Sequence, residues 1–233
     1  MLLLFDIDGT LIRERPLAHQ RAMIDAVERV YGIEFAPGEE PIAEVVPHGK
    51  TDRQIVREIL SRRGIGHDVV DAGFEDFERL SCELHHELEQ PLLAGDARER
   101  TAAMLGRLAG GGHTLALLTG NLEPIARRKM ELAGLGDFFA AHEGAFGSDA
   151  EARPELVPIA RRRAGGAHGA HPADDTVIIG DTPQDVEAAH ADGARAIAIT
   201  GRRYGRDDLE RSGADAVVDD LDEVEGVLAG WRE

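Results

Sequence analysis

The chain has 233 residues, a length that fits one large domain or a core with a smaller insert. Its formal net charge of −18 argues against nucleic acid and an anionic membrane surface as partners, because both attract basic faces. The composition, 42% hydrophobic and 30% charged, is that of a soluble globular protein. An acidic protein can still bind a small phosphate where cations are concentrated, and a metal ion does this most simply.

The single cysteine, Cys82, leaves no partner for a disulfide within the chain, which fits a reducing compartment. The apolar run at residues 1–5 is too short for a signal peptide, and no stretch is long enough to span a membrane. These features predict a cytoplasmic protein. They carry no information about its oligomeric state.

Short, continuous apolar runs alternate along the chain with segments of helical periodicity. Continuous runs are typical of parallel strands that are covered on both faces, so the pattern predicts an α/β fold with a Rossmann-like parallel sheet. The predicted strands are residues 2–5, 114–118, 176–179, 196–199 and, more weakly, 216–218. The predicted helices of this part are residues 97–109, 123–133, 155–164, 183–191 and 222–228.

One region breaks the alternation and shows only helical periodicity, over residues 17–31, 52–62 and 69–89. It separates the first strand from the rest of the sheet, and prolines lie near both of its ends. We therefore expect an all-α insert at residues 14–91, and a catalytic core made of residues 1–13 and 92–233.

Polar residues follow three of the predicted strands. Ligands of open α/β sheets bind at the carboxyl ends of the strands, so these side chains should gather at one edge. They are Asp6 and Asp8 after the first strand, Thr119, Gly120 and Asn121 after the second, and Asp181 and Asp185 after the third.

The Asp6/Asp8 pair predicts phosphoryl transfer. One carboxylate can attack phosphorus to form an aspartyl-phosphate, while the other protonates the leaving oxygen and then deprotonates water. Mg²⁺ prefers oxygen ligands, and Asp6 and Asp181 can provide two carboxylates to it. The metal would offset the repulsion between these carboxylates and a phosphate dianion.

The other two strand ends allow a purely structural interpretation as well. Asn121 is a favourable N-cap for the helix that follows, although Thr119 and free N–H groups at the helix start could instead hold a phosphate. Thr182 and Asp185 fit a capping box. Asp181 precedes that cap, so capping does not explain it.

Together these residues resemble the haloacid dehalogenase superfamily, in particular its phosphoglycolate phosphatase-like branch. Residues 6–10, Asp-Ile-Asp-Gly-Thr, look like the first motif, Thr119 matches the second, and Asp181 and Asp185 match the fourth. The insert lies where this superfamily places a helical cap. The third motif usually contains a Lys; neither Lys50 nor Lys129 lies nearby, so Arg153 is the candidate, since a guanidinium can bind phosphate as a fork.

The resemblance implies a Mg²⁺-dependent phosphatase that acts on a small phosphorylated metabolite. Asp6 is then the nucleophile and Asp8 the acid and base, while Thr119 and Arg153 hold the phosphoryl oxygens. The metal ligands would be Asp6, the Asp8 carbonyl and Asp181, with Asp185 a ligand or a support. The residues expected to contact the substrate are Thr10, Gly120, Asn121 and Lys50.

Other reactions of the same fold remain open. A phosphomutase of the β-phosphoglucomutase type would use the same Asp pair but return the phosphoryl group to a sugar. A phosphonatase similar to phosphonoacetaldehyde hydrolase would form a Schiff base on Lys50. Asp8 counts against phosphonate cleavage and against dehalogenation, because those enzymes generally lack a second aspartate in the first motif. A non-catalytic protein of this fold would not need an intact set of Asp6, Asp8 and Asp181.

Overall fold

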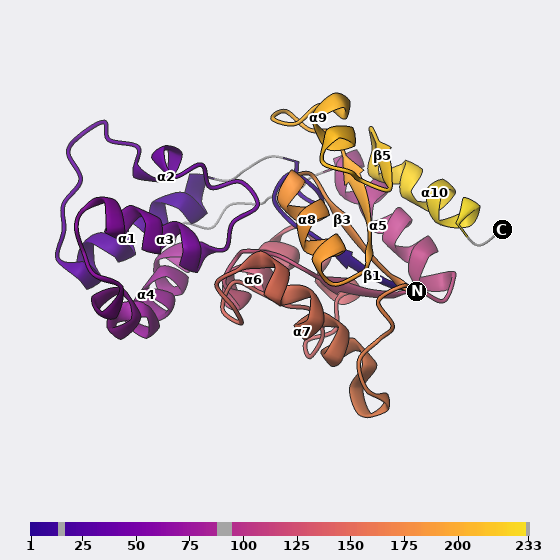
Figure 1. Cartoon of the computed structure of the whole chain (residues 1–233), viewed down its shortest axis with the longest axis horizontal. Coiled ribbons are helices and arrows are strands. Elements are labelled where there is room, and N and C mark those ends of the chain that lie inside the picture. The colour runs from indigo at the N-terminus through magenta and orange to yellow at the C-terminus, as the bar shows by residue number, and fades with distance from the viewer. Residues whose placement is uncertain (14–16, 88–94, 232–233) are drawn as a thin grey trace.

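The computed structural model describes residues 1–13, 17–87 and 95–231, and its centre is a five-stranded parallel sheet in the order β2-β1-β3-β4-β5 (Figure 1). Strand β1 lies between β2 and β3, and its Leu3 lies opposite Leu115 on one side and Val177 on the other. The strands are β1 (Leu2–Phe5), β2 (Thr114–Leu117), β3 (Thr176–Gly180), β4 (Arg195–Ile199) and β5 (Ala216–Val218).

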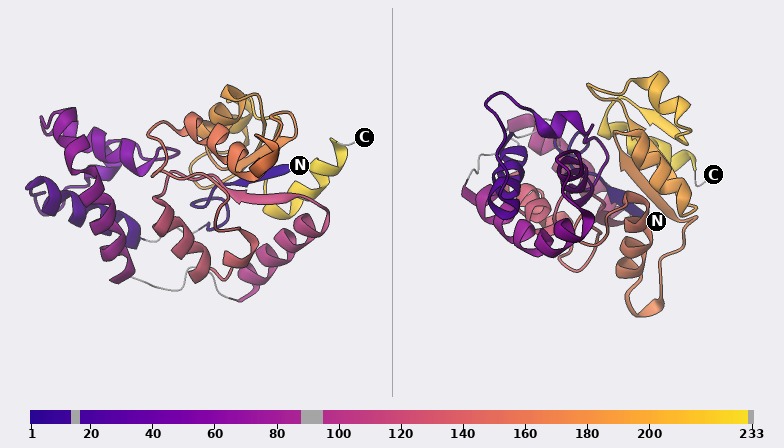
Figure 2. Two further views of the ribbon diagram at one scale, coloured as in Figure 1. Left: turned by 90° about the horizontal axis from the view of Figure 1, so that it is seen from below. Right: turned by 60° about the vertical axis from the view of Figure 1, so that its left-hand side comes forward.

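Helices cover both faces of this sheet, which explains why its strands are continuously apolar (Figure 2). Successive side chains of a strand point to opposite faces, so Leu3 and Phe5 belong to one hydrophobic cluster and Leu2 and Leu4 to another. The first cluster includes residues of α5 (Gly95–Gly110), α6 (Glu123–Leu132) and α10 (Val224–Gly230). The second includes residues of α7 (Arg153–Gly165), α8 (Pro183–Ala191) and α9 (Arg206–Arg211).

Four further helices form a separate group, which we call the helical insert, at the left of Figure 1. They are α1 (Leu17–Tyr31), α2 (Pro41–Glu44), α3 (Asp52–Arg62) and α4 (His67–Glu87). Their apolar faces make a third hydrophobic cluster, in which Val27, Val56 and Phe77 are fully buried. Leu122 and Ile125, at the start of α6, join the same cluster. The insert is therefore packed onto the end of one core helix.

The predicted fold class, an α/β core with a Rossmann-like parallel sheet and an added helical part, is confirmed. The helices at residues 17–31, 52–62 and 183–191 have the predicted bounds. Sequence periodicity does not reveal α2 and α9, which have 4 and 6 residues and so are too short to show a period. The structure also has short 3₁₀ turns at η1 (Gly136–Phe138), η2 (Gly166–His168) and η3 (Leu221–Glu223).

The predicted domain boundaries, after residues 13 and 91, fall at segments 14–16 and 88–94, which lie outside the described residues. The boundaries therefore stay a prediction. Within the described part of the chain, no helix is both long enough and apolar enough to cross a membrane.

Candidate active site

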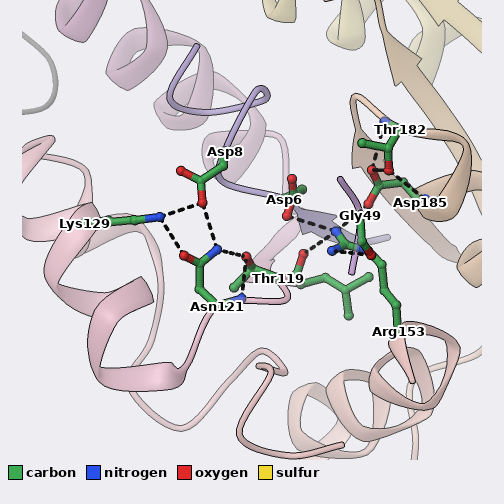
Figure 3. Close-up of polar contacts among 10 residues, drawn as sticks. Asp6, Asp8, Gly49, Thr119, Asn121, Lys129, Arg153, Thr182 and Asp185 are labelled. Carbon is green, nitrogen blue, oxygen red and sulfur yellow. Dashed lines mark hydrogen bonds and ion pairs between the residues drawn. The ribbon is translucent and has the colours of Figure 1, made fainter. Parts of the chain in front are cut away.

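The three strand ends that carry polar residues meet at one edge of the sheet (Figure 3). Asp6 follows β1, Thr119 follows β2, and Asp181 and Asp185 follow β3. Asp6, Asp181 and Asp185 are all buried, and each offers a carboxylate oxygen within 4.8 Å of those of the other two. Such a set of hard oxygen donors suits a cation such as Mg²⁺, because three buried carboxylates repel one another in its absence.

Gly9 allows the loop after β1 to approach the loop after β3. Its φ is +103°, a conformation that L side chains rarely adopt, and an added Cβ would lie 2.1 Å from Oδ2 of Asp181. The glycine of the first motif therefore brings the carboxylate of Asp181 next to the segment that carries Asp6 and Asp8.

Arg153, in the first turn of α7, lies beside the proposed nucleophile. Its Nη2 is 2.9 Å from Oδ1 of Asp6 and 2.5 Å from Oδ1 of Asp185, and it also donates to the carbonyl of Leu118 at 3.3 Å. Among the described residues its buried Nε has no hydrogen-bond partner. A phosphate oxygen next to Asp6 could accept from this guanidinium, the contact expected from its place in the sequence.

The electrostatic surroundings of Asp6 disfavour its ionised form. Burial raises its pKa to about 6; the neighbouring carboxylates of Asp185 and Asp8 act in the same direction, while Arg153 opposes them. A cation at the carboxylate cluster would stabilise the ionised form, in which Asp6 is a nucleophile.

Asp185 has both carboxylate oxygens engaged. Oδ1 pairs with Arg153, and Oδ2 accepts from the backbone N–H of Thr182 at 3.0 Å and from its hydroxyl at 2.6 Å. The capping box predicted for α8 is present. Asp185 thus both caps this helix and holds Arg153 in place.

Asp8 is the centre of a second polar cluster, on the opposite side of Asp6 from Asp185 in Figure 3. Its Oδ2 accepts from Lys129 at 2.6 Å and from the side-chain amide of Asn121 at 2.9 Å. Lys129 also donates to Oδ1 of Asn121 at 2.6 Å, and the amide donates to the hydroxyl of Thr119 at 2.7 Å. Burial alone would raise the pKa of Asp8, but the charge and hydrogen bond of Lys129, together with His19 and Asn121, outweigh burial and lower the pKa to about 2.

Lys129 is a candidate functional residue that the sequence pattern did not single out. It projects from α6, is almost fully buried, and lies on the same helix face as Ile125, Ala126 and Met130. The signal that could have revealed it is a cation on an apolar helix face, because a buried lysine needs acceptors.

The start of α6 differs from the prediction. Leu122, rather than Asn121, is the N-cap residue, so the expectation that Asn121 caps this helix is wrong. The N–H of Leu122 donates to Oδ2 of Asp52, at 2.9 Å, and that of Glu123 donates to the hydroxyl of Ser148, at 3.0 Å. These two N–H groups are therefore not available to a phosphate, in contrast to what the sequence suggested.

Gly120 contacts the helical insert. An added Cβ would lie 2.1 Å from the carbonyl oxygen of Lys50, and the carbonyl of Gly120 accepts from the N–H of Asp52 at 2.8 Å. The ammonium of Lys50 donates to Glu58 at 2.5 Å and to the carbonyl of Val45 at 2.6 Å, and both of these bonds stay within the insert. The backbone of the Lys50 loop therefore closes over the strand end.

Thr10 is fully buried and is not among the described residues that line the pocket beside Asp6. Its placement does not favour the predicted contact with substrate. The core residues that line that pocket are Asp6, Asp8, Thr119, Gly120, Asn121, Lys129, Arg153 and Thr182. The insert contributes the opposite wall, which contains both polar and apolar side chains: His19, Gln20, Met23, Ile42, His48, Lys50 and Ile55.

Comparisons with known proteins agree with this geometry. Residues 1–193 match the haloacid dehalogenase-like hydrolases, and the chain belongs to this family. The predicted superfamily and the prediction of a hydrolytic enzyme are therefore confirmed. The predicted phosphatase type agrees with a relative: phosphoglycolate phosphatase from Rhodospirillum rubrum is 28% identical over 221 residues, which cover 94% of this chain and 86% of that protein.

Solved structures show the same fold. A phosphonoacetaldehyde hydrolase-like protein from Oleispira antarctica has a TM-score of 0.68 at 16% identity, with 98% of this chain and 91% of that one covered. A candidate β-phosphoglucomutase from Bacteroides vulgatus has a TM-score of 0.66 at 18% identity, with 100% and 90% covered. At these identities the likeness supports the fold and does not distinguish the reactions.

Proposed function

We propose that the protein is a Mg²⁺-dependent phosphatase that hydrolyses a small phosphomonoester through an aspartyl-phosphate on Asp6. The observation that carries this proposal is the position of Asp6, which is buried beside Arg153 and close to the carboxylates of Asp181 and Asp185, with Asp8 in the same pocket. A nucleophilic carboxylate, a phosphate-binding cation, a metal-ligand set and a second carboxylate thus share one site.

In the proposed reaction Asp6 attacks phosphorus, and the bond from phosphorus to the leaving oxygen breaks as Asp8 gives that oxygen a proton. Asp8 then takes a proton from water, which attacks the phosphorus of the aspartyl-phosphate and releases inorganic phosphate with Asp6 restored. The low pKa of Asp8 keeps it ionised, which is the form that can accept a proton in the second step. In the first step, the negative charge of a bound phosphate raises that pKa and favours the acid form.

The phosphoryl oxygens would be held by the guanidinium of Arg153 and by the hydroxyl of Thr119. Asp6, the backbone carbonyl of Asp8 and Asp181 would hold Mg²⁺, which supplies compensation for the charge gathered on phosphate and carboxylates. Asp185 would support Arg153 rather than bind the metal, because both of its oxygens already accept hydrogen bonds.

The helical insert, predicted at residues 14–91, would act as a cap that excludes bulk water from the reaction. The leaving group would contact its wall, where Met23, Ile42 and Ile55 are apolar and Gln20 and His48 are polar. The relative from Rhodospirillum rubrum makes phosphoglycolate the first substrate to test. We keep a cytoplasmic location as a prediction.

A panel of phosphorylated metabolites, assayed for phosphate release with Mg²⁺ and with a chelator, tests this proposal. We expect release that requires the metal and that Asp6→Asn abolishes. Equal activity of Asp6→Asn and the wild type would refute the mechanism. A sugar phosphate converted to an isomer without free phosphate would instead indicate a mutase.

A further inference from the structure

A buried chain of polar side chains runs from the helical insert to Asp8. Oδ2 of Asp52, in α3, lies 3.0 Å from Nε2 of His19, in α1. The other ring nitrogen, Nδ1, lies 3.2 Å from Nζ of Lys129 in core helix α6, and Nζ lies 2.6 Å from Oδ2 of Asp8. Asp52, His19 and Lys129 are all less than a tenth exposed.

The hydrogen-bond chemistry gives this chain one direction. An ammonium only donates, so Nδ1 of His19 accepts from Lys129, and Nε2 therefore carries the hydrogen and donates to Asp52. The three donors of Lys129 then match its three acceptors, on Asp8, Asn121 and His19. Removal of His19 would leave one donor of a buried ammonium without its acceptor.

The contact between His19 and Lys129 depends on how the insert is docked on the core. His19 and Asp52 belong to the insert, whereas Lys129 and Asp8 belong to the core. Asp52 also accepts from the N–H of Leu122. Its carboxylate therefore binds both His19 and the start of α6. The ring of His85, in α4, packs edge-on against that of His19, with ring centroids 5.9 Å apart.

We propose that His19 is a positioning residue which, through Lys129, fixes the carboxylate of Asp8 when the insert is docked. Both hydrogen bonds of Asp8 go to Oδ2, and among the described residues Oδ1 accepts none, which leaves Oδ1 to exchange protons with the substrate and water. This inference rests on the proposed function, because it assigns His19 and Lys129 to the step in which Asp8 protonates the leaving group.

The experiment assays the wild type, His19→Leu and His19→Asn on two substrates. His19→Leu removes the acceptor for Lys129, whereas the amide of His19→Asn can still accept and donate. An alkyl phosphate needs a proton on its leaving oxygen, whereas 4-nitrophenyl phosphate needs little help. We expect His19→Leu to lower kcat for the alkyl phosphate by about tenfold or more, with KM changed less. The loss should be smaller for 4-nitrophenyl phosphate and partly restored in His19→Asn.

Lys129→Met provides an independent arm should His19→Leu fail to fold. It should show the same dependence on the leaving group. The double variant should lose no more than the larger single loss if His19 acts through Lys129. Arg128→Met is the matched control on the same helix, where Arg128 pairs with Glu131 at the surface, and it should retain wild-type kinetics.

The outcomes separate the two proposals. If Asp6→Asn retains activity, the proposed function itself fails. If Asp6 is required, but the His19 and Lys129 variants lose nothing or lose the same factor on both substrates, only the positioning role is overturned. Additive losses in the double variant would likewise contradict the chain from His19 through Lys129.

Discussion

Asp6 and Asp8 are two residues apart, yet their surroundings move their pKa values in opposite directions. Burial and two nearby carboxylates raise the pKa of Asp6 to about 6, whereas Lys129 and Asn121 hold that of Asp8, against the effect of burial, at about 2. A pair of titratable groups separated in this way is typical of a site where each has its own role. Asp6 is thereby suited to a cation, and Asp8 stays ionised until the negative charge of a bound phosphate raises its pKa.

The raised pKa of Asp6 predicts how metal binding depends on pH. Protons compete with Mg²⁺ for this carboxylate, so the affinity should be constant well above the pKa of about 6 and should fall as the pH drops through it. Calorimetric titration with Mg²⁺ at about pH 7.5 and about pH 5 measures the change, which we expect to be about tenfold or more. Asp6→Asn is the control and should bind weakly at both values; equal wild-type affinities would contradict the prediction.

At the scale of elements, the contact between the insert loop and the strand end of β2 depends on Gly120. Gly120→Ala places a Cβ 2.1 Å from the carbonyl oxygen of Lys50, a backbone atom that cannot move alone. We expect a lower kcat and a lower melting temperature, since the 49–51 loop must shift from the site. Activity assays and thermal unfolding measure both.

Gly106→Ala is the matched control. Gly106 lies in helix α5, it is exposed, and the nearest atom to an added Cβ is 3.9 Å away. This change should leave activity intact and stabilise the protein by about 0.5–1 kcal/mol, because glycine is unfavourable within a helix. A Gly120→Ala variant as active and as stable as Gly106→Ala would show that the loop contact is unimportant.

Helices and strands could be predicted from the sequence where the signals that define them lie in neighbouring residues. The apolar runs and capping signals indicated most strands and helices, including the capping box at Thr182. The start of α6 was not predictable, because the carboxylate that accepts from Leu122 belongs to Asp52, 70 residues away. Local pattern cannot show a cap provided by a distant element.

The same limit applies to the site. Asp6, Asp181 and Arg153 could be found because each directly follows a strand or begins a helix at the shared edge. Lys129 lies 121 residues from Asp8 and its role depends on how the insert and α6 pack. His19 is likewise visible only in the structure, since no spacing in the sequence relates it to Lys129.

At the scale of the whole molecule, docking of the insert joins the two halves of the site. The hydroxyl of Thr51, which caps α3, donates to the carbonyl of Glu151 at 2.6 Å, and Arg57 bonds the carboxylate of Glu151 at 2.6 Å. The apolar side chains of Leu122 and Ile125 complete the contact. Polar and apolar contacts thus hold the insert against the core beside Asp6.

Cys82 offers a direct measure of this docking. It lies in α4 and lines a cavity with Pro124 and Ile125 of α6. Burial raises the pKa of its thiol to about 11, and Glu78 and Asp52 act in the same direction. A raised thiol pKa means less thiolate at neutral pH, so the folded protein should react with a disulfide reagent more slowly than the unfolded chain.

The Glu151→Gln variant removes the charge that Arg57 binds across the interface, and it should speed this reaction if the insert opens to expose the thiol. Because Cys82 is the single cysteine, the labelling rate reports on one site. The unfolded chain in denaturant provides the upper reference. If the folded and unfolded protein reacted at the same rate, the packing of α4 against α6 would not shield the Cys82 thiol.

The most direct test of the central claim is to trap the covalent intermediate. Borohydride added during turnover of a phosphorylated substrate reduces an aspartyl-phosphate to homoserine, and mass spectrometry of the digested protein locates the change. The account predicts homoserine at position 6, dependent on Mg²⁺ and on substrate. Phosphate release with position 6 unmodified, or substrate trapped as an amine on Lys50, would contradict it.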